Sequence, residues 1–246
     1  MEDGVVSQVQ PGQIDKGMGF GEKFINIFLN PHKTIMALDN KPTWLVPLLL
    51  IILAGLIASQ VTLPIESQMA LKMIRNMPNI SADQMKVIEE QLSGNLTLAR
   101  IRGLVTSIIG IPLVFLIISG IVFFVGSIVL GGSTSFKKVF SVFTWSGLIY
   151  MLSLIVVTPL ILYKQSLFVS ISPALLLPGD AVGSTLFIFL SQLSFFIIWQ
   201  VVVFAYGFAC IYKFSLTKAF ISIGVLWAIW VVIITIFAST FSKFMM

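Results

Sequence analysis

Five long apolar stretches dominate the pattern of hydrophobic and polar positions along the 246-residue chain. None of them contains Asp, Glu, Lys or Arg, and each is longer than the roughly 18 apolar residues that indicate a transmembrane helix. The pattern therefore predicts an all-α polytopic membrane protein, with a bundle of five transmembrane helices in residues 44–246. The predicted spans are 44–63, 104–130, 140–163, 185–210 and 219–241.

The first 43 residues differ from the rest because they are polar or mixed. Residues 1–19 hold glycines among polar residues without an apolar period, and we expect a disordered tail. Residues 20–43 form an amphipathic segment, with Glu22, Lys23 and Asn26 expected away from its apolar face. This segment lies either on the membrane interface or against the protein's own loops. The apolar face is also a candidate partner interface, and its residues are Phe20, Phe24, Ile27 and Phe28.

Two proline motifs precede the first span. Asn30-Pro31 lies within this segment, and Lys41-Pro42 lies at its end. Asn30 and Pro31 suit the N-cap and first position of a second short helix, which runs to about Asp39. Trp44 follows as an interface anchor at the start of the first span. We expect Pro64 to end that span.

Residues 65–100 form the only sizeable polar insertion between spans, and we interpret them as a helical hairpin on one membrane face. A capping-box pattern at Ser81 starts its second helix, which is expected to end at Gly94. Its first helix carries a methionine stripe, for which packing against the bundle is favoured over ligand binding. The stripe is also a candidate partner interface, and it consists of Met69, Met73 and Met77.

Gln192 and Gln200 are the long polar side chains well inside a predicted span. Eight residues apart on one continuous helix, they would share a face and hydrogen-bond to a neighbouring helix. The alternative is that they line a path for an uncharged or lipidic solute, beside a kink at Pro112 in the second span.

Composition strengthens the membrane assignment. Hydrophobic residues make up 57% of the chain and charged residues 10%, whereas soluble domains carry about 25% charged residues. The net charge of +5 is not gathered into a cluster dense enough to follow a phosphate backbone, so we expect no nucleic-acid partner. The basic residues instead flank the spans.

The distribution of Lys and Arg favours a cytoplasmic N-terminus and an external C-terminus in the cell membrane. With the insertion set aside, eight lysines lie inside and two, Lys164 and Lys243, lie outside. The insertion adds five basic residues to the outer side, which weakens the excess of basic residues on the inner side. Two Ser-Lys motifs in the inner loops, Ser135–Lys138 and Ser215–Lys218, share the order Ser, apolar residue, any residue, Lys, and the segment from Asn30 to Lys33 partly repeats it. The eight inner lysines are Lys16, Lys23, Lys33, Lys41, Lys137, Lys138, Lys213 and Lys218.

Candidate chemistry is scarce. His32 is the single histidine and Cys210 the single cysteine, so the chain lacks the ligands for a zinc site and cannot form an internal disulfide. Intramembrane proteolysis needs a Ser–His pair or two facing carboxylates, and the predicted spans carry neither. We therefore expect a protein without catalytic activity, cofactor or metal.

Several motifs, in their order and spacing, resemble the YIP-domain family (Ypt/Rab-GTPase-interacting proteins) in its prokaryotic branch. The resemblance runs from about Phe20 to the C-terminus. The motifs are Asn30-Pro31, Lys41-Pro-Thr-Trp44, Ser81–Gln91, Pro178-Gly-Asp180, Gln192–Trp199, Gly207 and Ser215–Ala219.

The resemblance implies a five-span bundle with a cytoplasmic N-terminus. Eukaryotic members are linked to vesicle traffic and small GTPases, but their Asp-Leu-Tyr-Gly-Pro stretch is absent here, so GTPase binding is not carried over. Ser194 stands where prokaryotic relatives often have Asp. Prokaryotic members mostly lack an assigned activity, and at least one resembles an accessory subunit of an ATP-binding-cassette exporter.

The sequence thus predicts a membrane adaptor or accessory subunit that contacts other membrane proteins, with exporter subunits as candidate partners and the lipid bilayer as its solvent. Formation of a homo-oligomer is compatible with this prediction. The alternatives are a transporter or channel for an uncharged or lipidic solute, and a bilayer-shaping role for the N-terminal amphipathic helix.

Overall fold

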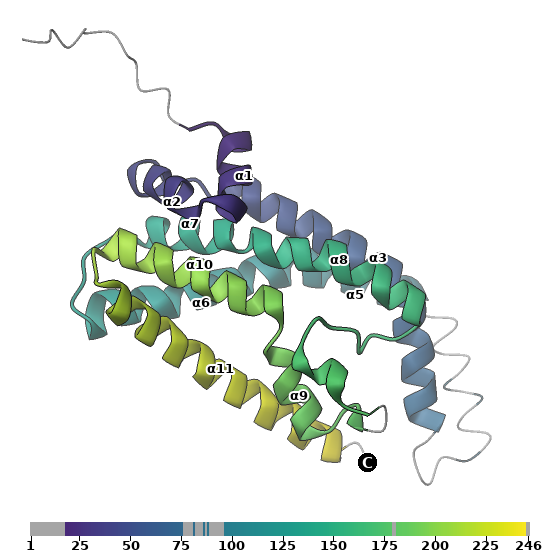
Figure 1. Cartoon of the computed structure of the whole chain (residues 1–246). Coiled ribbons are helices and arrows are strands. Elements are labelled where there is room, and N and C mark those ends of the chain that lie inside the picture. Colours follow the sequence, from purple (N-terminus) through teal and green to yellow (C-terminus); the bar gives the residue numbers. More distant parts are fainter. Residues whose placement is uncertain are drawn as a thin grey trace, which may run out of the picture.

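The computed structural model describes residues 18–75, 81, 86, 88, 96–178 and 181–244, and this part of the chain is helical, without strands (Figure 1). Two short helices precede a bundle of long ones. The α-helices are α1 (Phe20–Leu29), α2 (Pro31–Asn40), α3 (Leu45–Arg75), α5 (Leu96–Val105), α6 (Ile111–Phe124), α7 (Phe136–Ser146), α8 (Leu148–Lys164), α9 (Thr185–Gln192), α10 (Phe195–Tyr212) and α11 (Leu216–Phe244).

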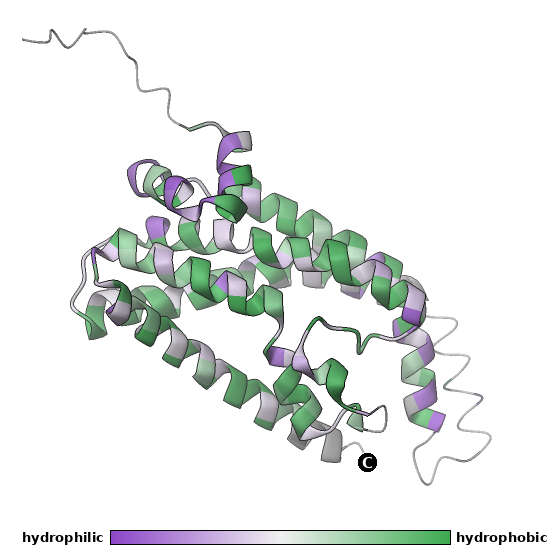
Figure 2. Ribbon diagram, viewed as in Figure 1, coloured by the Kyte–Doolittle hydropathy of each residue, from purple (hydrophilic) through white to green (hydrophobic). Residues whose placement is uncertain are grey.

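Five helical segments in the described residues are long and apolar enough to cross a membrane, which confirms the predicted all-α five-span architecture. Hydrophobic residues cover most of the length of these segments. Hydrophilic residues lie mainly toward their ends and on the short N-terminal helices (Figure 2). The segments are Leu45–Lys72, Thr97–Val129, Phe136–Lys164, Phe195–Tyr212 and Leu216–Ala238.

The expected end of the first span at Pro64 is wrong. Helix α3 continues through Pro64 to Arg75, so its 31 residues reach about 46 Å at 1.5 Å per residue. Proline is tolerated inside a membrane helix when neighbouring helices support it. Here α5 packs beside the preceding turn, where Gln60 Nε2 donates to the Arg100 carbonyl at 3.3 Å. The first part of the predicted insertion is therefore an extension of α3, and its Ser81–Gly94 helix lies largely outside the described residues.

The second span absorbs its proline without a break. A π-helical turn at Thr106–Gly110 comes directly before α6, in which Pro112 occupies the first turn. A second π-helical turn, Val125–Val129, ends the span. Such turns insert one extra residue into a helix, which changes the face that follows without interrupting it.

The predicted fourth span, 185–210, is divided in the structure. Helix α9 ends at Gln192 and α10 begins at Phe195. The Phe195 amide donates to the carbonyl of Ile171, in the loop after α8, at 3.0 Å. In a continuous helix this amide would bond to residue 191, so the inserted loop takes over a helical hydrogen bond. The four-residue 3₁₀ turn Pro173–Leu176 belongs to the same loop and packs on α9.

The third span is the centre of the bundle. All residues from Val139 to Ile149, across the α7–α8 junction, are buried. Helix α6 packs on α7, α3 packs mainly on α8, and α10 crosses both. Helix α11 lies outermost, against α9 and α10. The first, second and fourth spans therefore take their positions from this buried segment.

The two ends of the bundle differ (Figure 1). Helices α1 and α2 lie at the end that also holds the α6–α7 and α10–α11 connections. The opposite end holds α9 and the end of α11. Five antiparallel crossings thus place the N-terminal helices and the end of the last span on opposite faces.

Gly207 allows α10 to approach its neighbours closely. A Cβ atom at this position would collide with Val142 of α7 and lie 3.4 Å from Ile35 Cδ1 of α2. Small residues at such contacts are common in membrane helices, because association there depends on van der Waals packing. Gly224 of α11, by contrast, has open space around its Cα.

We expect Gly207→Ala to destabilise the protein by about 1–3 kcal/mol, because the added methyl group overpacks a three-helix contact. Thermal unfolding in detergent measures the effect. Gly224→Ala is the matched control and should unfold at or slightly above the wild-type temperature. Equal stabilities of the two variants would contradict the close contact.

Candidate functional site

The candidate site is built on the N-terminal hairpin, which consists of α1, α2 and residues 41–44. The chain turns between its helices at Asn30, whose amide donates to the Asn26 carbonyl at 2.8 Å, and Pro31 starts α2. Proline suits the first helical position because it lacks an amide hydrogen that would be left unpaired there. The Thr34 hydroxyl then donates to the Lys23 carbonyl at 3.0 Å and joins the two helices.

The aromatic face of α1 packs against the bundle. Phe20 lies 5.5 Å from Trp145 of α7 between ring centroids, and Phe28 lies 6.1 Å from Trp199 of α10. Phe24 contacts both of its helical neighbours at 6.0 and 5.5 Å. The predicted face is thus real, and it meets two tryptophans of the spans rather than standing free. Ile27, on the same side of the helix, is fully buried.

Thr43 fastens the loop that leads into the first span. Its carbonyl accepts from Ser141 Oγ at 2.7 Å and from Trp145 Nε1 at 2.6 Å. Its amide donates to Ser141 Oγ at 3.1 Å. Ser141 and Trp145 are four residues apart on α7, so both project from one helix face. The backbone at the entry to α3 is therefore satisfied by the central span.

Helix α2 is attached to α10 at two points. His32 Nδ1 and Tyr206 Oη form a hydrogen bond of 2.6 Å, with their rings 6.0 Å apart. One turn further on, Ile35 lies over Gly207. The hairpin consequently holds the third and fourth spans together from one end.

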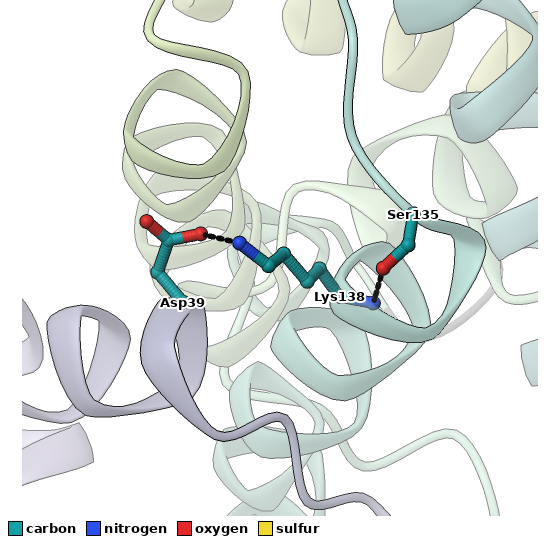
Figure 3. Close-up of polar contacts among 3 residues, drawn as sticks. All are labelled: Asp39, Ser135 and Lys138. Atoms are coloured by element: carbon teal, nitrogen blue, oxygen red, sulfur yellow. Dashed lines mark hydrogen bonds and ion pairs between the residues drawn. The ribbon is translucent and has the colours of Figure 1, made fainter.

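An ion pair ties the end of α2 to the start of α7 (Figure 3). Lys138 Nζ lies 2.5 Å from Asp39 Oδ1, and both side chains are partly shielded from solvent. The Lys138 amide donates to Ser135 Oγ at 3.4 Å, so Ser135 is the N-cap of α7. The cap fixes the first turn and thereby the origin of the lysine side chain.

The second Ser-Lys motif has the same construction. The Lys218 amide donates to Ser215 Oγ at 3.3 Å at the start of α11. Lys218 Nζ donates to the Leu130 carbonyl at 3.0 Å and lies 4.0 Å from the centroid of the Phe214 ring. In both motifs the serine therefore caps a helix, and the lysine side chain contacts another element. Asn30, the third partial match, makes no side-chain cap bond.

A family model matches most of the chain, since the Yip1 domain covers residues 25–238. The chain belongs to the Yip1 family. The match begins within α1 and ends near the end of α11, so it includes all five spans. No curated protein and no solved structure matches the chain.

Some of the motifs that carry the family resemblance in the sequence, although far apart along the chain, meet around the hairpin. Trp199 contacts α1, Gly207 receives α2, and the segment 41–44 is bound by α7.

The methionine stripe is placed only in part. Met69 lies in the extension of α3, where its Sδ accepts from the Leu167 amide at 3.3 Å. It therefore packs against the loop that follows α8. Met73 belongs to the same helix, and Met77 lies outside the described residues.

The expectation that Gln192 and Gln200 share one helix face is wrong. They belong to α9 and α10, and the break at residues 193–194 separates them. Both are half-buried, and neither side chain makes a hydrogen bond within the described part of the chain. A continuous apolar run predicts one unbroken helix, whereas this chain breaks the helix at residues 193–194.

Lys23 also departs from expectation. It was expected away from the apolar face, yet its side chain is only 7% exposed, next to Ile27. Burial lowers the pKa of this lysine, and the nearby charge of Lys41 lowers it further. Lys23 lies four residues before Ile27 and therefore shares its helix face. This spacing indicates burial, although a lysine is ordinarily expected to face water.

Ser141→Ala removes both contacts of the Ser141 hydroxyl with Thr43 and should loosen the hairpin by about 1–2 kcal/mol, because the half-buried Thr43 amide loses its acceptor. Hydrogen exchange of the α1 and α2 amides in detergent should accelerate at least about fivefold. Ser222→Ala is the matched control, since that hydroxyl bonds only to its own helix at Lys218. Unchanged exchange in Ser141→Ala would show that the two Ser141 contacts with Thr43 do not fasten the hairpin.

Proposed function

We propose that this Yip1-family protein is a membrane adaptor or accessory subunit that organises other membrane proteins, with an exporter as its candidate assembly. The observation that supports the proposal is the construction of the N-terminal hairpin. One side of it is fastened to two spans, and the other side presents large apolar side chains.

The outer edge of the hairpin is apolar although it lies outside the membrane-spanning segments. Ile25, Leu29 and Met36 are 58%, 80% and 44% exposed. Ile25 and Leu29 are four residues apart and share a face of α1. Exposed apolar groups that cluster in this way are typical of interaction surfaces. A partner helix or loop that covered them would be held next to α7 and α10.

The polar groups beneath this edge support a structural role rather than a catalytic one. His32, Asp39 and Ser141 each have a partner within the fold. Such groups position the hairpin and are not poised to transfer protons to a substrate. We therefore propose that the protein is not an enzyme and that it acts by binding.

The transporter alternative has less support. It rested on Gln192 and Gln200 lining one face, and the division between α9 and α10 removes that face. The hairpin, by contrast, assembles side chains from α1, α2, α7 and α10 in one place. The adaptor proposal therefore accounts for more of the folded structure.

We further propose that the hairpin end faces the cytoplasm of the cell and that the protein lies in the cell membrane. Lysines flank the short loops of this end at Lys137, Lys138, Lys213 and Lys218, as the preference of basic residues for cytoplasmic loops requires. The paired use of Lys138 and Lys218 in helix contacts shows that these positions also serve folding.

Cysteine labelling tests this orientation. In a Cys210→Ser background, we expect Lys137→Cys to react with a membrane-impermeant maleimide only after the membrane is opened. Lys164→Cys, at the opposite end, should react in intact cells. The reverse pattern would overturn the orientation without affecting the adaptor proposal.

Site-specific photo-crosslinking tests the adaptor proposal. A photoreactive residue at Leu29 or Met36 should give a protein adduct of defined mass in native membranes, and its identification should return a recurring membrane protein. The same residue at Ile233, 53% exposed on the outermost helix α11, is the control and should give mainly lipid adducts. Lipid adducts alone at both hairpin positions would contradict the proposal.

A further inference from the structure

The loop that follows α8 has the composition of a membrane segment, although it is too short to cross the bilayer. Residues 165–178 contain no Asp, Glu, Lys or Arg. A transmembrane helix needs about 20 residues, and the structure shows here only the four-residue 3₁₀ turn Pro173–Leu176. The loop is therefore apolar without being a sixth span.

A hydrogen bond to the fourth span fixes the depth of this loop. The Phe195 amide, at the start of α10, donates to the Ile171 carbonyl at 3.0 Å. The 18 residues of α10 extend about 27 Å from there to Tyr212, at the hairpin end of the bundle. The hydrocarbon core is about 30 Å thick, and any tilt of α10 makes the depth smaller still. Ile171 therefore lies at the level of the acyl chains in the leaflet opposite the hairpin.

The third span reaches farther than α10 from the same end of the bundle. The segment Phe136–Lys164 has 29 residues and is about 43 Å long, so Lys164 lies about 16 Å beyond the start of α10, on which α8 packs. Figure 1 shows the loop running back from the end of α8 toward the start of α10. The chain thus leaves the bundle at Lys164 and returns into it at Ile171.

The loop pairs backbone groups that would otherwise be costly at this depth. Non-helical backbone is tolerated inside a membrane only where its polar groups are satisfied. The Ala174 amide donates to Ser172 Oγ at 3.3 Å, and the Leu175 amide donates to the Ser172 carbonyl at 3.1 Å. Ser170 and Ser172 bond through their hydroxyl groups at 2.6 Å, and Pro173 has no amide hydrogen. This internal bonding suits apolar surroundings.

Two leucines of the 3₁₀ turn are left uncovered by the described part of the chain. Leu175 is 60% exposed and Leu176 is 88% exposed. The turn packs on α9, whose Leu186 and Phe189 are also exposed, so the leucines continue an apolar surface of the fourth span. Tyr163, 83% exposed at the end of α8, is a residue typical of the boundary between bilayer and water.

We propose that residues 165–178 form a re-entrant loop, which inserts Leu175 and Leu176 among the acyl chains of the leaflet opposite the hairpin. Lipid is the partner of this surface because the loop lies at acyl-chain depth and continues the apolar surface of α9. The loop also keeps the fourth span divided, since its Ile171 carbonyl occupies the Phe195 amide. The inference depends neither on the proposed adaptor function nor on which end of the bundle is cytoplasmic.

Spin labelling of the purified full-length protein in phosphatidylcholine nanodiscs tests the insertion. Leu176→Cys in a Cys210→Ser background carries the label, and power saturation measures its collisions with oxygen and with a water-soluble nickel chelate. The oxygen-to-nickel ratio should exceed that of a label at Lys164→Cys by at least about fivefold, because a polar chelate is excluded from acyl chains.

Ile233→Cys, on the outer face of α11, is the matched lipid control and should give a ratio close to that of Leu176→Cys. Leu175→Cys is the second loop position and serves if Leu176→Cys fails to fold, as judged by its unfolding temperature against the Cys210→Ser parent. A loop label with the ratio of Lys164→Cys would place the loop in water and overturn the proposal. Few collisions with either reagent would mean that protein covers the loop, which would also overturn it.

Discussion

The burial of the third span is the constraint on which the rest of this structure depends. Lipid does not drive apolar helices together, so the bundle is held by close packing and by polar contacts between helices. The continuous buried segment from Val139 to Ile149 offers a surface to α3, α6 and α10 at once. Glycines at the crossings make this possible, since Gly147 and Gly207 have neighbours where a Cβ atom would stand. Helix α11, which packs on α9 and α10, is consequently the outermost span.

The same central span also organises the hairpin. Ser141 and Trp145 of α7, both fully buried, satisfy the backbone of Thr43 at one point. The other contacts of the hairpin with the bundle lie close to this point in the chain. They are the packing of the aromatic face of α1, the contact of Ile35 with Gly207 and the ion pair of Asp39. A partner bound to the outer edge of the hairpin would thus act on α7 and α10 through fixed contacts.

Much of this architecture is predictable because membrane spans consist of long runs of uncharged residues. Five spans, two short helices divided at Asn30-Pro31 and the apolar face of α1 all follow from hydropathy, period and proline chemistry. The caps at Ser135 and Ser215 follow from a local motif in the same way. Span ends were harder, because a proline that ends a helix in water is supported by a neighbouring helix in a bundle. Pro64 shows this at α3.

The sequence by itself determined that the protein crosses the membrane five times and that its chain lacks the residues for familiar intramembrane chemistry, since both depend on local composition. Only the tertiary structure decided what the hairpin touches, where the fourth span divides and which lysine is buried. Each of these depends on a partner distant in the chain: Trp145 for Phe20, Ile171 for Phe195, and the packed bundle for Lys23. Such pairings leave no local period, because their free energy comes from contacts that exist only after the spans have assembled.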